Sequence, residues 1–133
     1  MITAVEIRGA RMARIWLKIA VVYLLIGVIF GLVMGMSHQF QYAPVHAHIN
    51  LLGWASLGLA GIIYWLCPRA GGHWLGLVHF WLHNIGLPIF VIGLFFLQGG
   101  NPSAQPVVAI GATIAVVGIL FFTVNVFLNL KKT

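Results

Sequence analysis

The sequence predicts an all-α integral membrane protein, a four-helix up-down bundle. Of its 133 residues, 62% are hydrophobic and only 6% are charged, and a soluble domain of this size cannot bury so much apolar surface. A helix needs about 20 apolar residues to cross a hydrocarbon layer about 30 Å thick. Four such runs follow one another, separated by short polar or Gly/Pro-rich breaks. We therefore expect a single transmembrane domain that occupies residues 1–133.

The first two helices are expected at about residues 14–36 and 44–66. The first follows a basic stretch, as a secretory signal would, but it is longer than a signal core and no small-residue cleavage site follows it. It is therefore interpreted as a retained helix. The second helix carries several small residues, Gly53 among them, which permit close approach of a neighbouring helix or of a flat ligand.

The last two helices are expected at about residues 73–97 and 105–128. A Pro-Arg-Ala-Gly-Gly turn precedes the third helix, and an Asn-Pro-Ser turn precedes the fourth. The fourth helix is interpreted as scaffold. Its few polar residues, such as Asn125 and Asn129, are expected to satisfy one another or the membrane interface.

Positive charge marks the side of the membrane on which the termini lie. Basic residues precede or begin the first helix and follow the last, and Arg69 lies in the turn between the second and third helices. The other two loops, residues 37–43 and 98–105, contain no Lys or Arg. The positive-inside rule then predicts cytoplasmic termini. The net charge of +6 is read as a topology signal, so we expect lipid, not nucleic acid, as a partner, and location in the bacterial inner (cytoplasmic) membrane.

Histidine is the residue type most able to carry chemistry in this chain. Glu6 is the only carboxylate and precedes the predicted span, which excludes paired-carboxylate hydrolysis and carboxylate metal cages. Ionisable residues inside a span indicate function, and neutral imidazole binds haem iron, copper and zinc. Four histidines fall inside the predicted helices, His46, His48, His79 and His83, whereas His38 and His73 lie at or near helix ends.

The two histidine pairs differ in spacing. His46 and His48 are two residues apart and point about 200° apart on a helix, so at most one of them faces a given cofactor. His79 and His83 are four apart on one face, which suits two ligands of one ion or a hydrogen bond between helices. His48 lies close to the outer surface and His83 near mid-membrane, so we do not assume that one iron binds both.

A family resemblance favours His48 among these candidates. The stretch His-Ile-Asn-Leu-Leu at residues 48–52, followed by Gly-Ile-Ile-Tyr-Trp-Leu-Cys-Pro at 61–68, resembles the second transmembrane helix of the haem-copper oxidase catalytic subunit. The nitric oxide reductase and C-type oxidase branches are most similar. The resemblance extends over about residues 44–97. It implies that His48 is an axial ligand of haem b, and Asn50 also matches the family pattern. Because small residues of this helix can accommodate a flat ligand, we also expect Gly53 and its neighbour Trp54 to belong to the cofactor-binding surface.

The resemblance implies only part of such an oxidase. The chain lacks the later helices that carry the second haem ligand and the copper-binding histidines, so we do not expect a complete oxidase or nitric oxide reductase, and enzyme activity stays open. A second axial ligand must come from another histidine or from another protomer. The leading prediction is a haem b-binding homo-oligomer that carries electrons to or from a redox partner or binds a diatomic gas such as nitric oxide or oxygen.

Two alternatives stay open. The first is a copper-binding or copper-handling protein that uses imidazole and thioether ligands near the outer face, drawn from His38, His46, His48, Met34 and Met36. The second is a structural accessory subunit without a cofactor, in which the histidines form hydrogen bonds between helices.

Overall fold

The computed structural model describes residues 1–130 and is helical over 92% of the chain. Four of its segments are long and apolar enough to cross a membrane: Ala4–Ser37, Phe40–Leu66, Trp74–Gln98 and Pro102–Asn129. No strand occurs in the described part. The predicted fold class, four transmembrane helices, is confirmed, and three of the four predicted segments agree with the structure to within a few residues.

Helix α1 (Ala4–Ser37) begins ten residues before the predicted start. The cause is a capping box at its N-terminus, in which the Thr3 side chain accepts from the Glu6 backbone and the Glu6 side chain accepts from the Thr3 backbone. Apolar content marks only the part of a helix that lies in lipid, so it does not reveal this polar extension. At 34 residues, α1 is about 51 Å long and exceeds the hydrocarbon layer.

The second membrane segment is one continuous helical rod with a change of winding. It consists of η1 (Phe40–Tyr42), α2 (Ala43–His48), the π-helical η2 (Ile49–Ala55) and α3 (Ser56–Leu66). A π segment inserts an extra residue per turn and is frequent at functional sites. Here it begins directly after His48, so the residues that carry the family resemblance lie at the change of winding.

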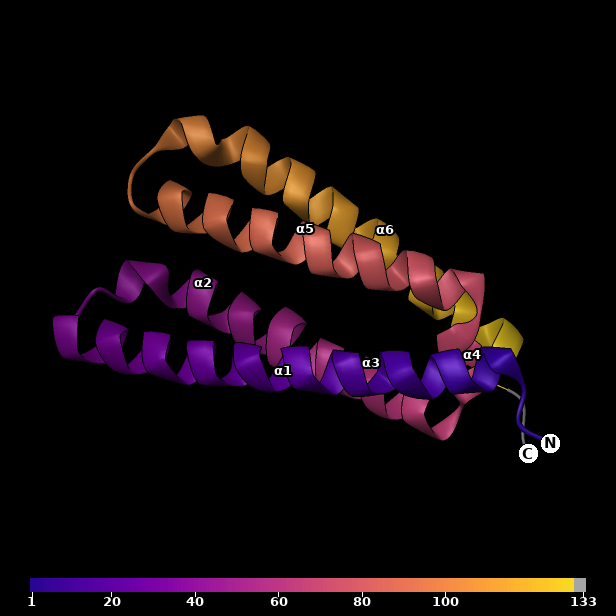
Figure 1. Ribbon diagram of the computed structural model, residues 1–133. Helices are drawn as coiled ribbons and strands as arrows, with labels where there is room; N and C mark the ends of the chain where they lie inside the picture. Colours follow the sequence, from indigo (N-terminus) through magenta and orange to yellow (C-terminus); the bar gives the residue numbers. More distant parts are fainter. Residues whose placement is uncertain (131–133) are drawn as a thin grey trace.

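A short helix, α4 (Pro68–Gly72), joins α3 to α5 (Trp74–Gln98). The His73 side chain caps α5 by accepting from the Leu75 backbone N–H at 3.3 Å. Helix η3 (Pro102–Ala104) then leads into α6 (Gln105–Asn129). The start of α1 and the end of α6 lie at the same end of the molecule (Figure 1), as an up-down bundle requires.

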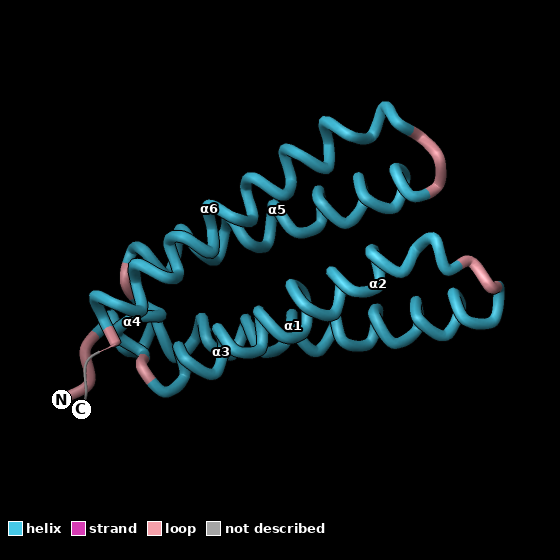
Figure 2. Tube along the Cα trace, turned by 180° about the vertical axis from the view of Figure 1, so that it is seen from behind, coloured by secondary structure: helices cyan, strands magenta, loops and turns pink. Residues whose placement is uncertain are grey.

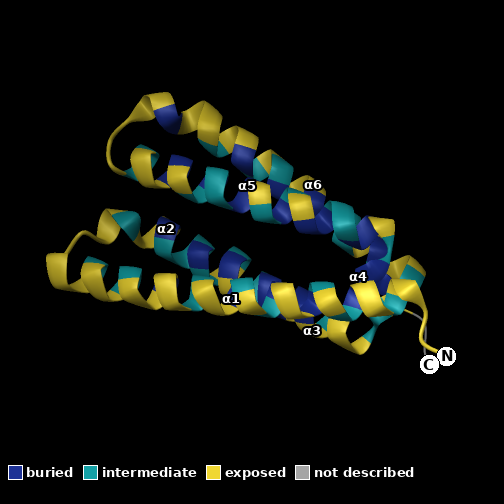
Figure 3. Ribbon diagram, viewed as in Figure 1, coloured by how far each residue is buried: buried dark blue, intermediate teal, exposed yellow. Residues whose placement is uncertain are grey.

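The helices form two hairpins that are joined at one end (Figures 1 and 2). Helix α1 packs along η2, α3 and α4, whereas α5 packs along α6. The backbone of α1 does not come close to that of α5 or α6 within the described residues. Buried side chains, including Trp16, Tyr64 and Leu87, fill the space between the hairpins. Most residues on the outward faces of the helices are exposed (Figure 3), as expected of helices that face lipid.

Candidate functional site

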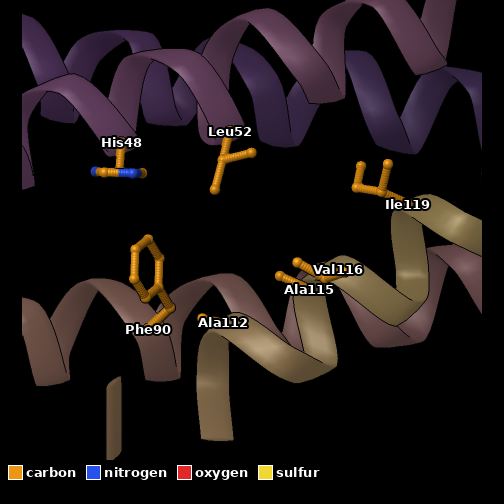
Figure 4. A pocket seen from close by; sticks show the side chains of 7 residues that line it. All are labelled: His48, Leu52, Phe90, Ala112, Ala115, Val116 and Ile119. Atoms are coloured by element: carbon orange, nitrogen blue, oxygen red, sulfur yellow. The ribbon is translucent and has the colours of Figure 1, made fainter. Parts of the chain in front are cut away.

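A pocket of about 310 Å³ lies between the two hairpins. The second membrane segment contributes His48 and Leu52, and the opposite wall belongs to α5 and α6 (Figure 4). Its size is at the lower end of the range for small-molecule sites, about 300–1,000 Å³. His48 is the one residue with a nitrogen donor atom in its lining. The other lining residues are apolar: Leu52, Phe90, Ala112, Ala115, Val116 and Ile119.

The His48 ring is held in an orientation suited to a metal ligand. Its Nδ1 lies 2.7 Å from the backbone carbonyl oxygen of Pro44, and because a carbonyl only accepts, Nδ1 carries the hydrogen. In the neutral ring Nε2 is then the unprotonated nitrogen, and it makes no hydrogen bond to any described residue. A ring N–H donated to a backbone carbonyl is the usual support of a metal-bound histidine.

Phe90 closes the pocket against His48. The two rings are perpendicular, with centroids 4.9 Å apart, and Phe90 itself is buried. Figure 4 shows the Phe90 side chain pointing from α5 toward His48. A flat ligand that binds the His48 nitrogen would therefore require the Phe90 ring to shift.

His46 points away from this pocket, toward α1. Its Nδ1 lies 3.0 Å from the carbonyl oxygen of Gly27, and a Cβ atom added at Gly31 would lie 2.6 Å from its Cε1. Asn50 supports the same contact by donating to the His46 carbonyl oxygen at 2.9 Å. His46 and His48 thus face different helices, as expected from their spacing, and both His46 and Asn50 lie inside the first hairpin.

Gly53 and Trp54 do not line the pocket. Gly53 is buried against Tyr23 of α1, where an added Cβ would lie 2.6 Å from the tyrosine ring. Trp54 is 38% exposed. The small residue therefore serves close packing of α1, and the structure does not bring Gly53 or Trp54 together with His48.

His79 and His83 are buried in a hydrogen-bonded chain. His83 Nε2 lies 3.0 Å from the carbonyl oxygen of Leu52, and His79 Nε2 lies 3.3 Å from His83 Nδ1. The remaining nitrogen, His79 Nδ1, lies 2.9 Å from the hydroxyl oxygen of Tyr64. All four ring nitrogens therefore have partners, and in this arrangement neither ring offers a free lone pair to a metal ion.

The chain continues into α6 and has a single direction. Asn129 donates to the Asn125 side-chain oxygen at 2.8 Å, and Asn125 donates to the Tyr64 hydroxyl at 3.3 Å and to the Ala70 carbonyl at 2.9 Å. Because Leu52 presents only an acceptor at the far end, each donor in turn is fixed: Tyr64 donates to His79 and His79 to His83. The expectation that Asn125 and Asn129 satisfy one another is confirmed.

The Trp16 side chain covers the two buried histidines. Its ring lies 4.5 Å from that of His79 and 5.7 Å from that of His83, measured between centroids. Its indole N–H is buried and has no hydrogen-bond partner among residues 1–130. The buried cluster therefore joins α1, α3, α5 and α6 at the level where the two hairpins meet.

The residues considered for copper are dispersed. Among residues 1–130, no group of three or more His, Cys, Asp or Glu residues is close enough to hold one metal ion. His38 ends α1 in the left-handed conformation, with φ 54°, and His46 and His48 face different helices. A copper site built from these histidines would need a different arrangement of the chain.

Sequence reasoning missed the opposite wall of the pocket and two members of the buried chain. Phe90, Ala112 and Val116 are apolar residues in apolar helices, so no local signal separates them from lipid-facing neighbours. Tyr64 is likewise inconspicuous within the second helix. Asn125 did carry a signal, since an amide inside a span requires a partner, but the identity of that partner depends on how the hairpins pack.

Comparison with known proteins gives a partial similarity. The chain is 33% identical over 69 residues to cytochrome c oxidase subunit 1 of Rhodobacter capsulatus. The aligned region covers 47% of this chain but only 13% of that relative. No protein-family model and no solved structure matches the chain. The comparison therefore agrees with a relation between part of this membrane protein and an oxidase subunit.

Proposed function

We propose that the protein binds haem b in the bacterial inner membrane, with His48 as an axial ligand, and serves electron transfer or the binding of a diatomic gas. The observation that carries this proposal is the state of the His48 ring. Its Nδ1 is engaged by the Pro44 carbonyl, its Nε2 has no hydrogen bond to a described residue, and the ring lines the pocket between the hairpins.

The pocket suits a porphyrin in its chemistry. Its lining is apolar apart from His48, and apolar surroundings exclude water and tune the redox potential of a bound haem. Ala112 and Ala115 have small side chains, so a flat ligand could lie close to the α6 backbone on this side of the pocket. The pocket is smaller than its occupant would need, so the Phe90 ring would move and the hairpins would part slightly as the ligand enters.

The coordination of the iron would follow from the donors available. When bound, haem b would supply a reversible iron couple or, with one axial position open, a site for nitric oxide or oxygen. The α5 and α6 residues that line the pocket carry no side-chain donor. This chain alone would therefore offer one axial ligand, and a second would come from another copy in a homo-oligomer. Copper is not favoured at this pocket, because His48 is the only lining residue with a side-chain ligand atom.

An optical spectrum tests the proposal. Purified wild-type protein should show a dithionite-reduced minus oxidised difference spectrum of haem b, and pyridine haemochrome analysis should give the stoichiometry. His48→Ala should remove the haem, because no other lining residue has a nitrogen donor. His46→Ala is the matched control and should retain it, since His46 contacts α1 instead. Colourless wild-type protein from haem-replete cells, or full haem content in His48→Ala, would contradict the proposal.

A further inference from the structure

Three basic side chains on α1 have no partner among the described residues. Arg8 donates to the Gly72 carbonyl and Arg69 pairs with Glu6, whereas no hydrogen bond or ion pair is found in residues 1–130 for the remaining three. These lie within about 60° of one another around the helix, opposite its buried face, and all are exposed: Arg11, Arg14 and Lys18.

One of these residues borders an apolar groove. The groove lies between α1 and α3 and has a volume of about 340 Å³. It is lined by Arg14 and Leu17 of α1 and by Ile62, Trp65 and Leu66 of α3. The three apolar side chains of α3 are exposed. The guanidinium group of Arg14 thus lies at the edge of an exposed apolar surface.

The position of the groove along α1 matches the membrane interface. Lys18 and Ser37 are separated by about 29 Å at 1.5 Å per residue, close to the thickness of the hydrocarbon layer. Arg14 then lies about one turn beyond the hydrocarbon boundary, among the headgroups, and Leu17, which lines the same groove, lies next to that boundary. Trp65 lies at the same level, where tryptophan is enriched in membrane proteins.

We propose that this groove binds an anionic phospholipid, with its phosphate at Arg14 and the beginning of one acyl chain against Leu17 and Ile62. Arginine binds phosphate through two parallel hydrogen bonds, and Arg11 and Lys18 add positive charge on the same face of α1. The apolar groove gives the acyl chain a contact that inorganic phosphate lacks. This site is separate from the His48 pocket and does not depend on haem.

Lipid titration of the full-length protein tests this site. Protein in a zwitterionic detergent is titrated with dioleoyl phosphatidylglycerol, dioleoyl phosphatidylcholine or inorganic phosphate, and bound lipid is counted by native mass spectrometry. We expect one phosphatidylglycerol to be retained at concentrations where phosphatidylcholine is lost and phosphate has no effect. Equal retention of both lipids would overturn the proposal.

Variants separate a defined site from general attraction. Arg14→Gln should weaken phosphatidylglycerol binding about fivefold, the effect of one basic residue near anionic lipid. Arg11→Gln removes the same charge from the same face but does not line the groove, so its effect should be smaller. Ile62→Trp fills the groove without changing charge and should also weaken binding. Equal losses for Arg14→Gln and Arg11→Gln, with no loss for a folded Ile62→Trp, would overturn the proposal in favour of non-specific attraction.

Discussion

The two histidine pairs differ in what their ring nitrogens do. In the first hairpin, His46 and His48 each place Nδ1 on a backbone carbonyl and leave Nε2 without a hydrogen-bond partner in the described residues. Between the hairpins, His79 and His83 use every ring nitrogen in a chain that runs from Asn129 to the Leu52 carbonyl. Residue type is the same in both pairs, so availability for ligation is decided by the neighbours.

The difference also separates binding from stability. A buried imidazole with both nitrogens satisfied rigidifies its surroundings, and removing it leaves its partners unsatisfied. A half-exposed imidazole with a free nitrogen contributes less to the fold and more to a ligand. Leu52 connects the two regions, because its carbonyl ends the buried chain while its side chain lines the His48 pocket.

The largest expected effect is that substitution in one histidine pair removes haem, whereas substitution in the other pair lowers thermal stability. His48→Ala should lose haem and keep the thermal stability of the haem-free protein, because its ring packs mainly against Phe90. His83→Ala should keep haem, but its free energy of unfolding should fall by about 1–3 kcal/mol, because the partners of the His83 ring are left unsatisfied and buried. Haem content and thermal unfolding in detergent measure both. Loss of haem in a folded His83→Ala protein would reverse the assignment of the two pairs.

A second prediction concerns the wall opposite His48. Val116 lines the pocket on α6 and is 67% exposed, so Val116→Trp should fill the pocket without disturbing the core and reduce haem affinity at least about tenfold, the loss of a well-matched apolar contact. Val124→Trp, on the same helix but outside the pocket lining, is the control.

Phe90→Ala provides the opposite change to the same pocket. Removing the ring that contacts His48 should preserve or tighten haem binding if the site lies between the hairpins. Haem titration of the haem-free variants, followed by absorbance, measures all three. Unchanged affinity in Val116→Trp would place the haem elsewhere.

The sequence predicts the membrane helices well because their signal is local. Apolar runs locate three of the four segments closely, and the early start of α1 depends on a capping box, Thr3 and Glu6, in a stretch too polar to resemble a span. The spacing of His46 and His48 also predicts that they face apart. By contrast, Phe90 and Val116 meet His48 only through the packing of the hairpins, which no pattern within one helix encodes.

A third prediction tests the direction of the buried chain. Tyr64 donates to His79 and accepts from Asn125, so Tyr64→Phe leaves a donor and an acceptor unsatisfied and should destabilise the protein by about 1–3 kcal/mol. Asn125→Leu preserves the Tyr64–His79 bond but leaves the Ala70 carbonyl and the Asn129 amide without their partner, so it should cost at least as much. Thermal unfolding of both variants gives the comparison, and equal stability of Tyr64→Phe and wild type would show that the chain is not maintained.

The smallest expected effect concerns the space in which His46 lies against α1. An alanine Cβ at Gly31 would lie 2.6 Å from His46 Cε1, whereas nothing lies within 4 Å of the same atom at Gly35, one turn further along the same helix. Overpacking costs about 1–3 kcal/mol, and replacing a helical glycine by alanine gains about 1 kcal/mol. Gly31→Ala should therefore be destabilised by up to about 2 kcal/mol, and Gly35→Ala should be stabilised by up to about 1 kcal/mol. Because His46 does not line the pocket, haem content should be the same in both variants. If Gly31→Ala loses haem while remaining folded, His46 affects the cofactor, and the assignment of haem binding to His48 and of helix packing to His46 is wrong.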